Sequence, residues 1–196
     1  DNDEIKLSDF GLAINYHEEP STITGYRPHQ PLEVIEGNPM SKLSDIYAMG
    51  ITFYRLLNNT NKLDFNFENH EEWRKAVKSN KFPPRNLSPH VPTKLIRVLN
   101  KSIHNDKEKR YQTCGEFRQA IDRLRFFIDW NQVDDDTWVG VNNEDHYEIE
   151  KLRNRNGWII NFKKNGIRRT ERCYKNLPDQ LVDKEFFDNI RQTTLI

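Results

Sequence analysis

One helix in the first two-thirds of the sequence constrains the fold more than any other stretch. Its apolar residues recur at helical spacing, at Ile46, Met49, Gly50, Phe53, Leu56 and Leu57. Further apolar residues stand on its other sides, at Ala48, Ile51 and Tyr54. A helix that is apolar on several sides has to be buried on most of its surface. With Ser41 as a suitable N-cap, residues 41–57 predict a helix at the centre of a larger helical assembly.

Weaker helical patterns lie on both sides of this helix. A short helix is expected over 31–37, opened by proline and closed by glycine. Apolar spacing predicts two more helices, over 71–79 and 95–103. A final helix is expected over 113–128, where Thr113 and Glu116 fit a capping box and apolar residues then repeat along one face.

The residues before these helices predict one strand and a loop. Ile5 and Leu7 form a short apolar run, and the polar stretch 14–30 lacks helical or strand periodicity. The sequence up to Asp129 therefore predicts an almost all-helical array behind one N-terminal strand and loop.

Charge, cysteine count and hydropathy exclude several classes of protein. The 196 residues carry no net charge, so no overall field attracts the chain to nucleic acid or to a membrane. No apolar run approaches the roughly 18–20 residues that span a bilayer, and no secretory signal opens the chain. The two cysteines suggest neither a disulfide framework nor a metal site. We expect a cytoplasmic protein without a membrane partner.

The strand at residues 5–7 leads into Asp9-Phe10-Gly11, followed by a loop that contains Ser and Thr residues. A carboxylate at the end of a strand, beside an aromatic anchor and a flexible glycine, is suited to binding a metal ion. Three residues alone are weak evidence, because ordinary strand-to-turn junctions look the same.

Several patterns in order make residues 3–128 resemble the C-terminal lobe of the eukaryotic-type protein kinase family. Asp9-Phe10-Gly11 looks like the magnesium-binding motif, and Pro31-Leu32-Glu33 stands where the family has Ala-Pro-Glu. The stretch 44–50 looks like the buried central helix of the lobe, and 106–111 is similar to the segment whose arginine pairs with that glutamate. The resemblance covers about two-thirds of the chain.

The resemblance implies a role for each matching residue. Asp9 would hold Mg²⁺ against the phosphates of ATP, with Phe10 and Gly11 in structural roles. Glu33 and Arg110 would form a buried ion pair, and Asp45 would support the backbone of the catalytic loop.

The loop that follows Gly11 contains candidates for regulation. Ser21, Thr22 and Thr24 stand where members of the family are often phosphorylated, and a phosphate there would order the loop if an arginine lay near. The alternative is an unmodified, solvated loop.

The sequence also departs from the family. It contains no glycine-rich nucleotide loop, no strand lysine with its helix glutamate, and no catalytic loop with its base Asp and second metal-binding Asn. The stretch from Tyr26 to Glu33 is longer than usual, and Leu32 replaces a proline, so substrate preference does not carry over. Without these parts one carboxylate cannot bind ATP well or position a hydroxyl, and no catalytic residue is assigned on this chain.

The last third of the sequence contains mainly strand patterns in place of helical ones. Strand patterns cover 137–141, 146–150 and 158–162, a tight-turn signal stands at 164–166, and 167–174 suggests a fourth strand. Residues 182–190 predict a closing helix. The predicted fold is a mainly α kinase C-lobe fragment over 1–129, followed by a small α+β domain over 130–196 with about four antiparallel strands and one helix.

This domain separates its charges along the sequence. Residues 129–150 hold eight acids and no Lys or Arg, whereas 151–176 hold nine bases and one acid. The candidates for binding nucleic acid or an acidic peptide are Arg153, Arg155, Lys163, Lys164, Arg168, Arg169 and Arg172. The favoured alternative is that acidic and basic strands pair across one sheet, because 129–176 carry no net charge.

Three functions follow as hypotheses. The first is a partial protein kinase domain, whose intact parent transfers phosphate from ATP to Ser or Thr of a protein with Mg²⁺, while this chain alone is inactive. The second is a non-catalytic, pseudokinase-like scaffold that binds a protein partner. The third, which is not favoured, is a tail that binds nucleic acid.

Overall fold

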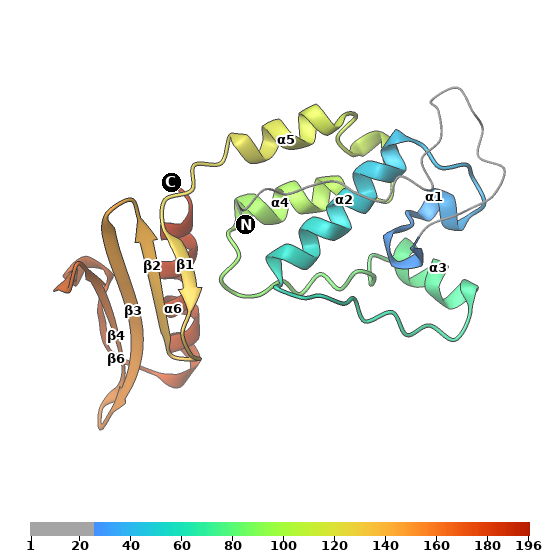
Figure 1. Ribbon diagram of the computed structural model, residues 1–196. Helices are drawn as coiled ribbons and strands as arrows, with labels where there is room; N and C mark the ends of the chain where they lie inside the picture. The colour runs from blue at the N-terminus through green and yellow to red at the C-terminus, as the bar shows by residue number, and fades with distance from the viewer. Residues whose placement is uncertain (1–25) are drawn as a thin grey trace. The chain divides into compact units, whose positions relative to one another are not determined.

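The computed structural model describes residues 26–196. Within them lie six α-helices and one antiparallel sheet of six strands (Figure 1). The predictions for the strand at 5–7, for the motif at 9–11 and for Ser21, Thr22 and Thr24 lie outside the described residues. The coarse fold class is confirmed, because the chain combines helices with an antiparallel sheet and a helix closes its sequence.

The described residues form two compact units. The first contains 26–86 and Leu99–Phe117, and the second contains Leu87–Val98 and Arg118–Ile196. The division predicted between residues 129 and 130 stays a prediction.

Helices make up the first unit. They are α1 (Leu32–Ile35), α2 (Lys42–Leu57), α3 (His70–Lys78), the C-terminal part of α4 (Thr93–Ser102) and the beginning of α5 (Cys114–Asp122). The 3-10 helix η1 (Arg27–His29) precedes α1, and η2 (Lys107–Lys109) lies between α4 and α5. The helices predicted over 31–37, 41–57, 71–79 and 95–103 are confirmed within one or two residues at most ends.

The central helix α2 begins as the sequence predicts. The side chain of Ser41 accepts a hydrogen bond from Leu43 N at 3.2 Å, and the Ser44 hydroxyl accepts one from Ser41 N at 3.1 Å. These bonds satisfy donors that the first turn of a helix otherwise leaves free. Gly50 packs so closely against α4 that a Cβ there would lie 2.4 Å from Ser102 Oγ.

Burial of α2 is less complete than its apolar pattern predicts. Ile46, Tyr47 and Ile51 are almost fully buried. Met49 and Leu56, however, are 43% and 73% exposed. One side of the helix is therefore uncovered, although its residues are apolar.

Aromatic side chains hold α3 in place. Trp73 and Val77 of α3 are buried with Ile35 of α1 and with Phe82. The ring of Phe65 lies edge-on to Trp73, with the ring centroids 5.4 Å apart. Such edge-to-face contacts are the preferred geometry of aromatic pairs.

The predicted helix over 113–128 is too long, because α5 ends at Asp122. The residues after it pair with the end of the chain, where Phe127 N donates to Thr194 O at 2.9 Å and Ile128 N donates to Thr193 O at 3.0 Å. Ile128 is buried in the core of the second unit. Its position fits a helical stripe, but contacts with residues distant in sequence decide its conformation.

The second unit is built on the sheet. Its strands are β1 (Asp129–Gln132), β2 (Thr137–Asn142), β3 (Asp145–Asn154), β4 (Gly157–Lys164), β5 (Ile167–Arg168) and β6 (Tyr174–Leu177). The order is β1-β2-β3-β4-β5, all neighbours are antiparallel, and β6 also pairs with β4. The helix α6 (Asp179–Thr194) covers one face (Figure 1).

Two features of the sheet were not predicted. β1 is a short edge strand, and its sequence Asp-Trp-Asn-Gln has no apolar alternation. The expected single strand over 167–174 is instead β5, the 3-10 helix η3 (Thr170–Arg172) and the start of β6. The sheet therefore has six strands in place of about four.

Alternation along β3 separates the two faces of the sheet. Tyr147 and Ile149 are buried under α6 with its residues Phe186 and Ile190, whereas Glu148 and Glu150 lie on the opposite face. The aromatic side chains that strands β1 to β4 contribute to this core are Trp130, Trp138, Tyr147, Trp158 and Phe162. One face of the sheet is thus a core and the other faces solvent, as in many antiparallel sheets.

Candidate functional site: a buried arginine and its carboxylate

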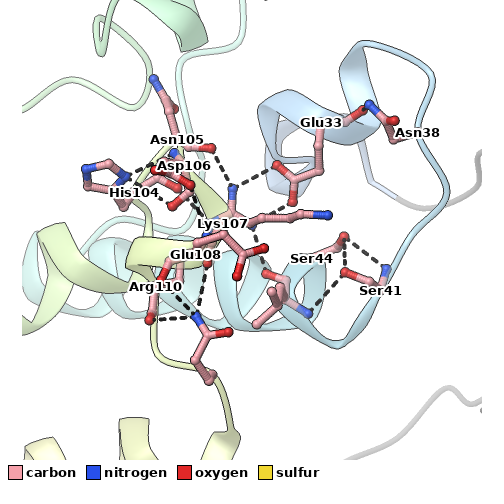
Figure 2. A network of polar contacts seen from close by, with 12 residues as sticks. Glu33, Asn38, Ser41, Ser44, His104, Asn105, Asp106, Lys107, Glu108 and Arg110 are labelled. Atoms are coloured by element: carbon pink, nitrogen blue, oxygen red, sulfur yellow. Dashed lines mark hydrogen bonds and ion pairs between the residues drawn. The ribbon is translucent and has the colours of Figure 1, made fainter.

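Glu33 and Arg110 meet in the first unit, although 77 positions separate them in the sequence. Arg110 Nη1 donates to Glu33 Oε1 at 2.6 Å and Nη2 donates to Oε2 at 2.8 Å. Figure 2 shows this bidentate contact between Glu33 of α1 and Arg110, the residue that follows η2. The Arg110 side chain is fully buried and that of Glu33 is 14% exposed.

Every donor of the guanidinium is used. Nε donates to His104 O at 2.6 Å, Nη1 also donates to Leu43 O at 2.9 Å, and Nη2 also donates to Asn105 O at 3.3 Å. Arginine has five N–H groups, and these contacts with the two carboxylate bonds account for all of them. The guanidinium carbon also lies 5.0 Å from the centroid of the Tyr47 ring. Arg110 thereby ties together α1, the start of α2 and the turn after α4.

The turn that presents Arg110 is fixed by its own polar contacts. Asp106 caps η2, because its side chain accepts from Glu108 N at 3.1 Å. His104 Nδ1 accepts from Asp106 N at 3.0 Å, which orients the carbonyl of His104 toward Arg110 (Figure 2). Asn105 Nδ2 donates to Val77 O at 2.9 Å and so ties the turn to α3.

The Glu33 end is fixed by the chain around α1. Asn38 donates twice to Glu33 O, through its backbone N and through Nδ2, both at 3.0 Å. These bonds close the chain behind a helix of only four residues, which has little stability of its own. Local hydrogen bonds therefore fix the backbone at both ends of the ion pair.

Asp45 lies in the first turn of α2, where the helix dipole favours a carboxylate. The residue is exposed, yet nearby protein atoms still desolvate its carboxyl enough to raise its pKa above the usual value. It shares the uncovered side of α2 with Met49, one helical turn away.

A family model described as the protein kinase domain matches residues 1–122, which is more than half of the chain. The chain belongs to the protein kinase family. It is 28% identical over 141 residues to a probable serine/threonine-protein kinase of Clostridium acetobutylicum, covering 69% of this chain and 20% of that protein.

Other relatives are named as tyrosine-protein kinases or as serine/threonine-protein kinases. The tyrosine-protein kinase MasK of Myxococcus xanthus is 30% identical over 125 residues, which cover 61% of this chain and 19% of that protein. The serine/threonine-protein kinase PknA of Mycobacterium tuberculosis is 26% identical over 130 residues, which cover 62% of this chain and 28% of that protein. The chain thus matches less than a third of the length of each of these relatives.

Some predicted site residues cannot be placed. Asp9, Phe10 and Gly11 lie outside the described residues, as do Ser21, Thr22 and Thr24. Within residues 26–196 no group of three His, Cys, Asp or Glu side chains is arranged to hold a metal ion. The assignment of Mg²⁺ to Asp9 stays a prediction.

Several basic residues of the second unit pair with its acids. Lys163 contacts Glu148 at 2.6 Å and Glu150 at 3.1 Å, and Lys164 contacts Asp145 at 2.6 Å, all across β3 and β4. The hydrogen bonds that both lysines donate to these carboxylates raise the pKa of each lysine. This is the cross-strand pairing that the sequence favoured.

The arginines of this unit make further contacts. Arg153 pairs with Asp179 of α6, Arg172 lies over the Phe162 ring with its guanidinium carbon 5.7 Å from the centroid, and Arg168 Nε donates to Cys173 Sγ at 3.3 Å. Arg155 and Arg169 lie in or beside turns. The five aromatic core residues named above pack with α6, so they form no platform for stacking bases, and nothing supports a nucleic-acid partner.

Sequence reasoning missed the carbonyl groups that complete the Arg110 site. Leu43, His104 and Asn105 contribute through their backbone oxygens, so their side-chain types carry no signal for this role. No helix within residues 26–196 is long and apolar enough to cross a bilayer.

Proposed function

We propose that this chain is part of a protein kinase that transfers phosphate from ATP to Ser or Thr residues of a protein, with residues 1–129 as its C-terminal lobe. The observation that carries the proposal is the Glu33–Arg110 pair, because it joins the segment before α2 to the turn after α4 through a fully used guanidinium. In this role the pair is a positioning element that fixes residues 26–35 beside the central helix.

The chain alone is proposed to be inactive. In the longer protein Asp9 binds Mg²⁺, which supplies charge neutralisation for the ATP phosphates. The sequence has no glycine-rich loop, no strand lysine with its helix glutamate and no catalytic base, so the Asp9 carboxylate alone cannot bind ATP well or position a substrate hydroxyl.

The uncovered side of α2 supports the same proposal. Met49 and Leu56 expose apolar surface there, and Asp45 stands in line with them, already partly desolvated. A further part of a kinase lobe that packed on this side would bury the two apolar side chains and give the Asp45 carboxylate donors to bind.

The alternative is a non-catalytic scaffold that binds a protein partner, with residues 130–196 as a separate α+β domain. The exposed apolar side of α2 is also compatible with this role, since uncovered apolar surface marks interaction sites. The two proposals differ in whether any longer natural form of the protein turns over ATP.

The test is a phosphorylation assay on this chain and on the protein produced from the uninterrupted natural reading frame. We expect no turnover by the chain, and ATP- and Mg²⁺-dependent labelling of a protein substrate by the longer form. Asp9→Ala should reduce that labelling by about a hundredfold or more. The matched control is Asp135→Ala, at an exposed turn between β1 and β2.

Each alternative outcome is informative. Equal activity of the Asp9→Ala and wild-type proteins would show that Asp9 does not bind the catalytic metal. A longer form without ATP turnover that still captures a protein partner would favour the scaffold.

A further inference from the structure

The edge of the sheet beyond β4 carries a concentration of positive charge. Residues 167–175, named here the basic edge, form β5, η3 and the start of β6. They contain four bases and one acid and so have a net charge of +3; the bases are Arg168, Arg169, Arg172 and Lys175. The one acid, Glu171, is exposed and forms no ion pair within residues 26–196.

The acids of β3, on the other side of β4, do not balance the basic edge. Glu148 and Glu150 share Lys163, and Asp145 pairs with Lys164. In the part of the chain that the structure describes, no carboxylate lies within ion-pair distance of any of the four bases. Their charge is therefore available to an anionic partner.

The acids of α6 are also engaged elsewhere. Glu185 and Asp188 lie near β6, because both act on the hydroxyl of Tyr174 and raise its pKa. Each of them pairs with a base of α6 itself, Glu185 with Lys184 and Asp188 with Lys184 and Arg191. Neither flank of the basic edge thus supplies a counter-charge.

Backbone and sulfur contacts fix the basic edge against β4. Arg169 N donates to Phe162 O at 2.8 Å, and Arg172 N donates to Arg169 O at 3.1 Å. Cys173 Sγ accepts from Phe162 N and from Arg168 Nε, both at 3.3 Å. A segment held in this way loses little conformational entropy when a partner binds to it.

Three of the four bases keep free donors. Arg168 uses only Nε, so both of its Nη groups are free. The side chains of Arg169 and Lys175 make no hydrogen bond to any residue between 26 and 196. Arg172 differs, because it lies over the ring of a core phenylalanine and donates to Asn189 Oδ1 at 3.4 Å.

The strand register places Arg168 and Lys175 on the face of the sheet that is turned away from α6. Arg168 is opposite Lys163, which lies on that face, and opposite residues of neighbouring strands share a face. Tyr174 is opposite the buried Ile160, so Lys175, which follows it, points away from the core and is exposed. Free positive charges therefore line the solvent-facing side of this edge.

We propose that the basic edge binds a carboxylate-rich segment of a partner protein. Hydrogen bonds from guanidinium and ammonium groups to carboxylates are charge-assisted and stronger than those between neutral groups. The three free bases stand on β5, on the turn after it and on β6, so a run of acidic side chains matches them better than one phosphate, which needs donors that converge on a point. The aromatic residues of β1 to β4 pack in the core, so a nucleic acid would find no stacking platform.

This inference goes beyond the proposed phosphate transfer and does not depend on it. The experiment uses the full chain and a fluorescent peptide rich in glutamate, with a second peptide in which glutamine replaces every glutamate. Fluorescence anisotropy measures binding at low salt and at about 0.15 M NaCl. The test variant removes the three free bases together, as Arg168→Gln, Arg169→Gln and Lys175→Gln. The matched control removes the same charge from exposed bases elsewhere in the second unit, as Arg97→Gln, Arg123→Gln and Arg125→Gln.

We expect the glutamate peptide to bind at least about tenfold more tightly than the glutamine peptide at low salt, because each exposed charge pair contributes up to about fivefold. The test variant should lose this preference, and the control variant should keep it within about twofold. Higher salt should weaken binding of the glutamate peptide, because it screens exposed charges. Circular dichroism checks that both variants are folded.

Three results would overturn the inference. The first is equal binding of the two peptides. The second is an equal loss in the test and control variants, which would assign the effect to overall charge. The third is binding of a thymidine oligonucleotide without binding of the glutamate peptide, which would assign the edge to nucleic acid. A longer form that lacks kinase activity, while the chain still prefers the glutamate peptide, would refute the proposed function alone.

Discussion

Replacing one partner of the buried Glu33–Arg110 ion pair should destabilise the first unit far more than replacing one partner of an exposed ion pair. Arg110→Met removes a fully buried guanidinium and leaves the Glu33 carboxylate, which is 14% exposed, without its two donors. It also leaves the carbonyls of Leu43, His104 and Asn105 without this partner. Loss of one member of a buried pair typically costs about 3–5 kcal/mol.

That loss is large compared with the total stability of a domain, which is about 5–15 kcal/mol. The assay is urea unfolding followed by circular dichroism, for wild type, Arg110→Met, Glu33→Gln and the double variant. Because each single change strands the remaining partner, the double variant should lose less than the sum of the two. We expect a coupling energy of at least about 1.5 kcal/mol.

Arg118 and Asp122 provide the matched control pair. They lie one turn apart near the end of α5, with side chains 83% and 59% exposed, and their contact measures 3.2 Å. An exposed pair at this spacing is worth about 0.3–0.5 kcal/mol. If the coupling energy of Glu33 and Arg110 were as small as that of the control pair, the argument that burial makes this contact decisive would be refuted.

Three further predictions concern packing, a hydrogen bond and pH. Gly50→Ala should destabilise the protein by about 1–3 kcal/mol, because its Cβ would lie 2.4 Å from Ser102 Oγ. Gly115→Ala is the control, because its Cβ would have no contact nearer than 3.6 Å. Thermal denaturation measures the stability of both variants. Trp130→Phe removes the 3.1 Å bond from Trp130 Nε1 to Thr193 Oγ1 and should cost about 0.5–1.5 kcal/mol in urea unfolding. The carboxylates beside Lys163 raise its pKa above 10.5, so its ion pairs should stabilise the fold fully below that pH and lose their effect as the pH rises through the folded-state pKa. The difference in unfolding free energy between wild type and Lys163→Gln should therefore shrink in that pH range. A difference that stays constant with pH would contradict this reasoning.

Local patterns in the sequence predicted the elements whose structure depends on neighbours within one or two turns. Ser41 and the apolar spacing that follows it placed α2 almost to the residue, because a capping side chain and its partners lie within three positions. Strand patterns over 146–150 and 158–162 predicted the central parts of β3 and β4, since alternation along a strand acts between residues only two positions apart.

The same kind of pattern failed where distant residues compete for the backbone. Ile128 lies on the helical stripe of Phe117 and Leu124, yet it is drawn into the core beside α6, because the backbone of residues 125–128 bonds to the last residues of the chain. The uncovered side of α2 is a second case, since apolar composition predicted burial for Met49 and Leu56. Burial depends on what packs against a helix, and the helix sequence does not contain that information.

The sequence by itself determined where helices and strands form in most of the chain, and the order of its motifs pointed to the kinase family. Only the tertiary structure decided that Arg110 uses all five of its donors and that the aromatic residues of strands β1 to β4 pack with α6. The physical reason is distance along the chain. Capping and periodicity act between near neighbours, whereas these sites join groups tens of residues apart, including backbone carbonyls that every residue type carries.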